Sequence, residues 1–105
     1  MANGEIPSKI IYQDQELAVF PDIKPKAPVH LLLVPKKHIA SVSDLVEDDI
    51  SLVGRMIYRA KQIAENKGIA KDGFRLVFNC RANAGQFIDH LHLHLIGGKP
   101  LGDMV

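Results

Sequence analysis

Three histidines alternate with leucines near the end of this 105-residue chain, at His90, His92 and His94, and Gly97 and Gly98 follow them. In an extended strand successive side chains point to opposite faces, so this spacing predicts that the three imidazoles share one face. An imidazole titrates near neutral pH and can therefore act as a nucleophile, a proton donor or a hydrogen-bonding support. The row of histidines is the first candidate for a functional site.

Three interpretations of this row are open. In the first interpretation the row is the polar face of a half-buried strand and has no function. Burying several imidazoles costs desolvation free energy unless each ring finds a hydrogen-bond partner, so a functional role is favoured. Two histidines at positions i and i+2 can bind one zinc ion. The ends of the row, however, lie about 13 Å apart, too far for all three to meet one ion. The third interpretation is attack on phosphorus by one imidazole while a neighbour protonates the leaving group, with Gly85 and Gly97–Gly98 letting the backbone approach a phosphate.

The surrounding pattern predicts a sheet that positions these histidines. Apolar segments at residues 10–12 and 17–20 flank a polar turn and predict a hairpin. The apolar run 29–34 ends at Pro35 and predicts a third strand, and the alternating residues 74–79 predict a fourth. The histidine segment supplies the fifth.

One long helix is predicted after Ser43, because apolar residues recur there at three- and four-residue spacing. These residues are Ile50, Val53, Ile57, Ala60 and Ala64. Acidic residues 47–49 suit the start of the helix and Lys67–Gly68 its end. Gly54 inside it costs about 1 kcal/mol relative to alanine, which indicates a close approach by a neighbouring element. We expect an α+β domain over residues 1–105, with an antiparallel sheet of about five strands and one long helix and a short helical turn packed on one face.

The amino-acid composition indicates which classes of binding partner to expect. The net charge of +1, from 13 basic and 12 acidic residues, gives no indication of a nucleic-acid or membrane surface. The longest apolar runs are far shorter than the roughly 20 residues that span a bilayer. The first residues lack the pattern of a secretion signal, and Cys80 is the only cysteine, so a reducing, cytoplasmic location is expected.

A set of ordered segments accompanies the histidines: Gly4–Ile10, Phe20–Ile23, Ala27–His30, Val34–Ile39 and Ala84–Gln86. Together with the alternating histidines and the two apolar residues after them, these segments resemble the histidine triad family of nucleotide-binding proteins. The resemblance is to the branch whose members hydrolyse nucleoside phosphoramidates, and it covers nearly the whole chain.

The resemblance implies separate roles for the histidines. His92 would attack the α-phosphorus and form a nucleotidyl-histidine intermediate, which water then hydrolyses to a nucleoside monophosphate. His90 would orient His92 and support its charge, and His94 would contact the phosphate and the leaving group. His38 would join the phosphate side of the site. His30, at the start of an apolar strand, is interpreted as a structural histidine outside the site.

The resemblance also implies a nucleotide-binding set. Asp22 would bind the ribose hydroxyls, and the purine would lie near apolar side chains, namely Ile6, Phe20 and Ile23. Asn79, Gly85 and Gln86 would contact the phosphate. Members of this branch are homodimers that pair their sheets and pack their long helices together, and they need no metal or other cofactor for turnover.

Two positions depart from the pattern of this branch. Phe87 stands where a serine or threonine usually follows the Gly-Gln pair, so a hydroxyl that would help to bind phosphate is missing. Asp89 precedes His90 where an aromatic residue is common. We therefore expect phosphate affinity or leaving-group preference to differ from that of the branch.

The expected function is hydrolysis of purine nucleoside 5′-phosphoramidates to AMP or GMP. The nearest alternative is a dinucleoside polyphosphate hydrolase or a nucleotidyl transferase of the same family. A non-catalytic nucleotide-binding or scaffold protein is an alternative of another class, which the loss of the hydroxyl at Phe87 modestly favours. A zinc-binding module is the third alternative.

Overall fold

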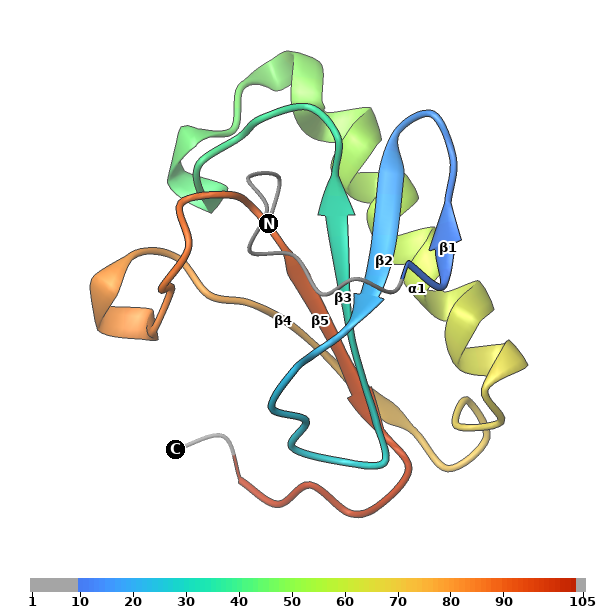
Figure 1. The fold of residues 1–105 in the computed structure, drawn as a ribbon. Coiled ribbons are helices and arrows are strands. Elements are labelled where there is room, and N and C mark those ends of the chain that lie inside the picture. The colour runs from blue at the N-terminus through green and yellow to red at the C-terminus, as the bar shows by residue number, and fades with distance from the viewer. Residues whose placement is uncertain (1–9, 104–105) are drawn as a thin grey trace.

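The computed structural model describes residues 10–103, which form a five-stranded antiparallel sheet with one long helix on one face (Figure 1). The strands are β1 (Tyr12–Gln13), β2 (Leu17–Pro21), β3 (Val29–Pro35), β4 (Phe74–Phe78) and β5 (Leu93–Gly97), in the order β1-β2-β3-β5-β4. The helix α1 spans Ile50–Asn66. Short 3-10 turns are η1 (Val42–Asp44), η2 (Glu47–Asp49) and η3 (Ala82–Ala84). The predicted α+β class is confirmed.

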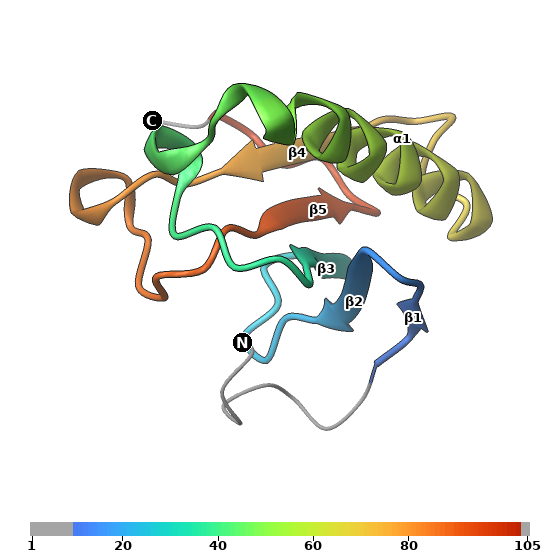
Figure 2. The ribbon, with the colours of Figure 1, turned by 90° about the horizontal axis from the view of Figure 1, so that it is seen from above.

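Alternation along the strands builds two apolar layers. The helix packs over the layer on one face of the sheet, as Figure 2 shows from above. This main core contains, among others, Leu17, Val19, Leu31, Leu33, Met56, Ala60, Leu93 and Leu95. A smaller cluster on other positions of the same strands contains Ala18, Phe20, Leu32 and Val34, with Ile88 packed against it. The second cluster supports the face of the sheet that carries the histidine chemistry.

Buried charge fixes the start of α1. The Asp49 carboxylate is 3% exposed; it accepts a hydrogen bond from the Val46 amide and lies 2.5 Å from Nζ of Lys37. The pKa of Asp49 is lowered, mainly by the hydrogen bond from the Lys37 ammonium and also by the one from the Val46 amide. At the other end Gly68 adopts φ +77° directly after the C-cap, as predicted for the end of the helix.

The histidine strand is shorter than predicted. β5 begins at Leu93, so only His94 of the three alternating histidines belongs to a strand. Leu33 of β3 is the last residue paired with β5. Pro35 has no amide proton with which to continue the ladder, and the Leu91 amide donates instead to the Ile39 carbonyl.

Three glycines differ from their predicted roles. A Cβ added to Gly97 would lie 2.8 Å from Cδ1 of Ile69, so the absence of a side chain there allows β5 to pack against the segment after α1. Gly97 and Gly98 do not line the histidine cavity. A Cβ on Gly54 would meet nothing within 4 Å among the described residues, so no element of the same chain makes the predicted close approach.

No helix within residues 10–103 is long and apolar enough to cross a membrane.

The side chain of Met56 is fully buried between α1 and the sheet. We expect Met56→Ala to lower the free energy of unfolding by about 2–5 kcal/mol, because it leaves a cavity in a layer that cannot collapse freely. Met56→Leu conserves volume and should cost less than about 1.5 kcal/mol. Urea denaturation followed by circular dichroism measures both, and equal costs would contradict this account of the core.

Candidate active site

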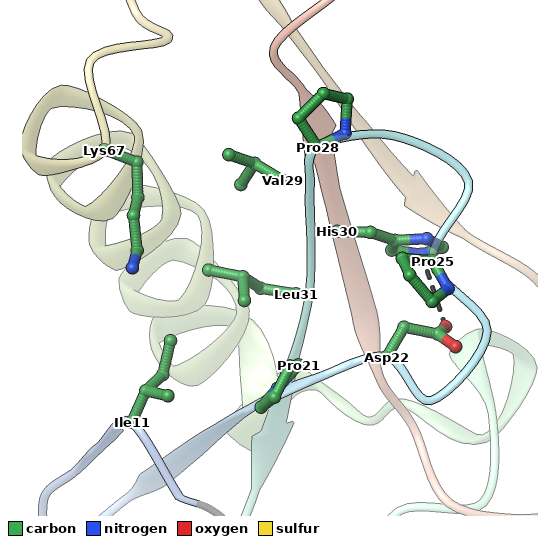
Figure 3. Close-up of a pocket in the computed structure, with 9 residues that line it drawn as sticks. All are labelled: Ile11, Pro21, Asp22, Pro25, Pro28, Val29, His30, Leu31 and Lys67. Carbon is green, nitrogen blue, oxygen red and sulfur yellow. Dashed lines mark ion pairs between the residues drawn. The ribbon is translucent and has the colours of Figure 1, made fainter.

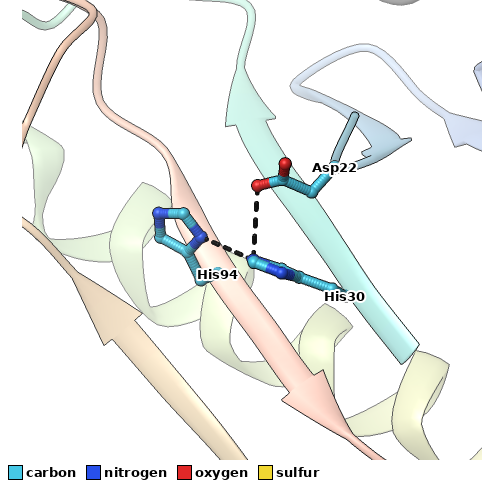
Figure 4. A group of neighbouring side chains, drawn as sticks. All are labelled: Asp22, His30 and His94. Atoms are coloured by element: carbon cyan, nitrogen blue, oxygen red, sulfur yellow. Dashed lines mark hydrogen bonds and ion pairs between the residues drawn. The ribbon is translucent and has the colours of Figure 1, made fainter. Parts of the chain in front are cut away.

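Three imidazoles meet on the open face of the sheet, and they are not the three of the predicted row. The rings of His92 and His94 lie 5.1 Å apart between centroids, and the ring of His30 lies 5.2 Å from that of His94. His30 comes from β3 and pairs with Ile96 of β5, which places it diagonally across from His94 (Figure 4). The interpretation of His30 as a structural histidine outside the site is wrong, because His30 lines the same cavity as His92 and His94. Its position in a strand that pairs with the histidine strand was the signal that could have included it.

The ring of His90 has other neighbours. It is 4% exposed, its Nε2–H donates to the Pro35 carbonyl at 2.8 Å, and its Nδ1 lies 3.2 Å from Nδ1 of His38. Neither His90 nor His38 lines the cavity that contains His92 and His94. The expectation that all three alternating imidazoles share one face therefore fails at His90, because the chain there is not yet in the strand.

The support that His90 gives to His92 runs through the main chain. Nδ1 of His92 lies 2.8 Å from the His90 carbonyl oxygen, which can only accept a hydrogen bond. The proton of neutral His92 is consequently on Nδ1, and Nε2 keeps its lone pair. This is the tautomer that a nucleophilic imidazole requires.

A chain of hydrogen bonds fixes the tautomers of the other two rings. The Lys26 amide donates to Nδ1 of His30 at 3.0 Å, so neutral His30 carries its proton on Nε2. That Nε2–H lies 2.9 Å from Nδ1 of His94 and donates to it. His94 therefore accepts at Nδ1 and carries its own proton on Nε2.

Both of these imidazoles are neutral at pH 7. The pKa of His94 is lowered to about 4, mainly by burial and further by the neighbouring His92 and His30. Burial also lowers the pKa of His30, against the opposing effect of the Asp22 carboxylate. The site thus presents a hydrogen-bond donor at His94 without placing a full positive charge beside His92.

The histidines open into a cavity of about 450 Å³ between two connecting segments. Two walls line it: Asp22, Ile23, Lys24 and Lys26 follow β2, and Asn79, Gly85, Phe87 and Ile88 lie between β4 and β5, on the other side of the β3–β5 pair in the strand order. His30, Leu32, His92 and His94 complete the lining. A volume of this order suits a small organic ligand such as a nucleotide. Of the predicted site residues, Asp22, Ile23, Asn79, Gly85, His92 and His94 are brought together here.

Other predicted contacts are indirect. Phe20 is 2% exposed and belongs to the apolar cluster under Leu32, so it supports the cavity without lining it. The Gln86 amide is used inside the chain: Nε2 donates to the Ala40 and Ile88 carbonyls, and Oε1 accepts from the Arg81 amide. Gln86 therefore stabilises the conformation of its own loop. Ile6 lies outside the described residues.

Asp22 holds the turn after β2 in place and keeps capacity for a ligand. Its Oδ1 accepts from the Lys24 amide at 2.8 Å, and its Oδ2 lies 3.3 Å from Nε2 of His30. An ionised carboxylate has about four acceptor positions, so two hydroxyl groups of a ligand can still donate to it. This matches the geometry that a ribose diol needs.

Asp22, His30 and His94 are close enough together to be considered as ligands of a metal ion. Ligand atoms of Asp22, His30 and His94 lie within 4.8 Å of one another. A metal at Nε2 of His30 would require the proton to move to Nδ1, which faces the Lys26 amide hydrogen, and two donors would then oppose each other. Metal-binding histidines normally donate their other N–H to an acceptor. The donor set therefore does not fit a divalent metal.

A second cavity of about 310 Å³ lies behind the Asp22–His30 pair (Figure 3). It is lined by Ile11, Pro21, Asp22, Pro25, Pro28, Val29, His30, Leu31 and Lys67. Neither His92 nor His94 reaches it, so it lacks the reactive pair of imidazoles. The cavity on the other side of the pair is the candidate active site.

Comparisons with known proteins agree with this fold. Residues 1–103 match the family model described as "Scavenger mRNA decapping enzyme C-term binding". The chain is 48% identical over 101 residues to the purine nucleoside phosphoramidase of Escherichia coli K12, covering 96% of this chain and 85% of that protein.

Solved structures agree as well. A HIT family hydrolase from Legionella pneumophila superposes with a TM-score of 0.91 at 44% identity, covering 97% of this chain and 91% of the other. A histidine triad protein from Clostridium difficile gives a TM-score of 0.90 at 40% identity, covering 99% and 90%. The chain belongs to the histidine triad (HIT) family, in its nucleotide-binding-protein branch.

The assigned tautomers can be observed directly. We expect long-range ¹H–¹⁵N spectra at pH 7 to show His92 protonated on Nδ1 and His94 on Nε2, because of the His90 carbonyl and the Nε2–H of His30. His94 should stay neutral as the pH falls through 6 and titrate only near its pKa of about 4. An Nε2–H tautomer for His92, or titration of His94 above pH 6, would contradict the network.

Proposed function

We propose that this protein hydrolyses purine nucleoside 5′-phosphoramidates, breaking the P–N bond and releasing AMP or GMP. The observation that carries the proposal is the placement of the free Nε2 lone pair of His92 beside the Nε2–H donor of His94 in one cavity. The 48% identity to a purine nucleoside phosphoramidase supports the choice of substrate.

The reaction divides into two steps. Nε2 of His92 attacks the α-phosphorus, the P–N bond breaks, and the nucleotide is held on His92 while the amine departs. The Nε2–H of His94 donates a hydrogen bond toward the phosphoryl group and the leaving nitrogen. The nitrogen takes a proton from solvent water as the P–N bond breaks and leaves as the neutral amine, and the water that attacks in the second step returns a proton to solvent. Water then attacks the same phosphorus, which releases the nucleoside monophosphate and restores His92. The His90 carbonyl stabilises the positive charge of the substituted imidazole throughout.

The two walls of the cavity bind the two ends of the substrate. Asp22 accepts hydrogen bonds from the ribose hydroxyls, and the purine lies near Ile23. Asn79 and the main chain at Gly85 lie on the phosphate side. His30 positions His94, and Gln86 positions the loop that carries Gly85.

The first test is removal of the nucleophile. We expect His92→Gln to lower AMP release from adenosine 5′-phosphoramidate by about 10³-fold or more, since no other group can form the covalent intermediate. His38→Gln serves as a matched control and should lower the rate far less, because the His38 ring lies outside the cavity. Turnover by His92→Gln close to that of the wild type would refute the mechanism.

We also propose that the protein is a homodimer that joins through α1 and the outer edge of β4. Ile50, Ile57 and Tyr58 are 44–68% exposed and lie with Gly54 on the side of α1 away from the core. β4 is an edge strand, and all five of its residues are half-buried. A second copy would cover these apolar groups and would supply the close approach that Gly54 allows.

Gly54→Leu tests this interface without damaging one chain, since nothing lies within 4 Å of the added Cβ. Light scattering of the wild type at micromolar concentration should give twice the 11.6 kDa mass of the chain, and Gly54→Leu should give the single mass. Asn66 is exposed on the same helix, so the Asn66→Leu variant is the control and should remain dimeric. A wild type of 11.6 kDa would contradict the proposal.

The proposal includes one domain over the whole chain and a cytoplasmic location. Cys80 is a free cysteine, which suits a reducing compartment.

A further inference from the structure

Phe87 combines two properties that rarely occur together. It lines the cavity that contains His92 and His94, yet its side chain is 95% exposed. A large aromatic side chain in water gains free energy when a ligand covers it, and a ring beside a catalytic cavity is placed to contact the substrate itself.

The chain on both sides of Phe87 is fixed. The Gln86 side chain is held by three hydrogen bonds, to Ala40, Ile88 and Arg81. Ile88 packs against the apolar cluster that contains Phe20 and Leu32. The ring therefore stands on an anchored segment, so little main-chain conformational entropy is lost when it meets a ligand.

The position of the ring relative to the histidines determines which part of a substrate it meets. In the proposed function Asp22 and Ile23, which follow β2, receive the nucleoside. Phe87 belongs with Asn79 and Gly85 to the segment between β4 and β5, and the strand order places this segment on the other side of the β3–β5 pair. With the phosphorus between these walls at His92, the group on the far side of the phosphorus from the ribose is the leaving amine.

We propose that Phe87 selects phosphoramidates whose leaving amine carries an aromatic group, by packing its ring against that group. The proposal rests on the proposed phosphoramidate hydrolysis. A packed aromatic pair and the apolar area it buries correspond to a preference of about tenfold.

The experiment compares two adenosine 5′-phosphoramidates that differ only in the amine, N-benzyl and N-methyl. We expect wild-type kcat/KM to favour the benzyl compound by about tenfold. Phe87→Ala should remove most of this preference, by lowering kcat/KM for the benzyl compound more than for the methyl compound. Alanine is chosen over serine because a new hydroxyl could itself contact the phosphate, and the exposed position makes loss of folding no concern.

Ile23→Ala is the matched control. Ile23 is also an exposed apolar residue of the cavity, at 73%, but it lies on the nucleoside wall that both compounds share. It should weaken both compounds equally and leave the benzyl-to-methyl ratio unchanged. The proposal is overturned by a ratio that Phe87→Ala does not change, or by one that Ile23→Ala lowers as much.

Binding separates this proposal from the proposed function. In a His92→Gln background, calorimetry gives the Kd of each compound without turnover, and Phe87→Ala should again reduce the benzyl preference by about tenfold. If the wild type releases no AMP from either compound, the hydrolytic function fails, and the ratio of Kd values still decides the role of Phe87. A Kd ratio near one in the Phe87-containing protein would overturn the proposal alone.

Discussion

The hydrogen bond from the Lys26 amide to Nδ1 of His30 determines the protonation of His30 and His94. It assigns the proton of His30 to Nε2, and His30 in turn assigns that of His94. Because the bond starts at a main-chain donor that cannot titrate, the direction of the network stays the same as long as His30 and His94 are neutral. The same bond opposes a metal ion at these residues and leaves them for acid–base and phosphorus chemistry.

The sheet brings this network together from distant parts of the sequence. Pairing of β3 with β5 places His30 beside His94, although 64 positions separate them in the chain. The end of that pairing before Pro35 is equally important, because it releases the chain at His90 and turns its carbonyl toward His92. A continuous strand through all three histidines would have placed the three rings in one row.

The fold could be predicted well from the sequence, because apolar periodicity fixes both the strands and α1. That His92 and His94 lie together could be predicted as well, since their types and spacing are local properties, whereas the separate roles expected of them come from the family resemblance. The role of His30 could not, because it depends on a pairing between strands and on the Lys26 amide. Gln86 and His38 were predicted as contacts from resemblance, whereas the structure directs their side chains to internal partners.

The loop after β2 has a consequence for how this site tolerates change. Its contribution to His30 is the amide of position 26, and the lysine side chain takes no part in that bond. Any residue with a main-chain N–H can therefore occupy this position without disturbing the imidazoles, whereas proline, which stands at positions 25 and 28, would remove the donor. Most substitutions in the exposed loop after β2 therefore leave the protonation of the reactive groups unchanged.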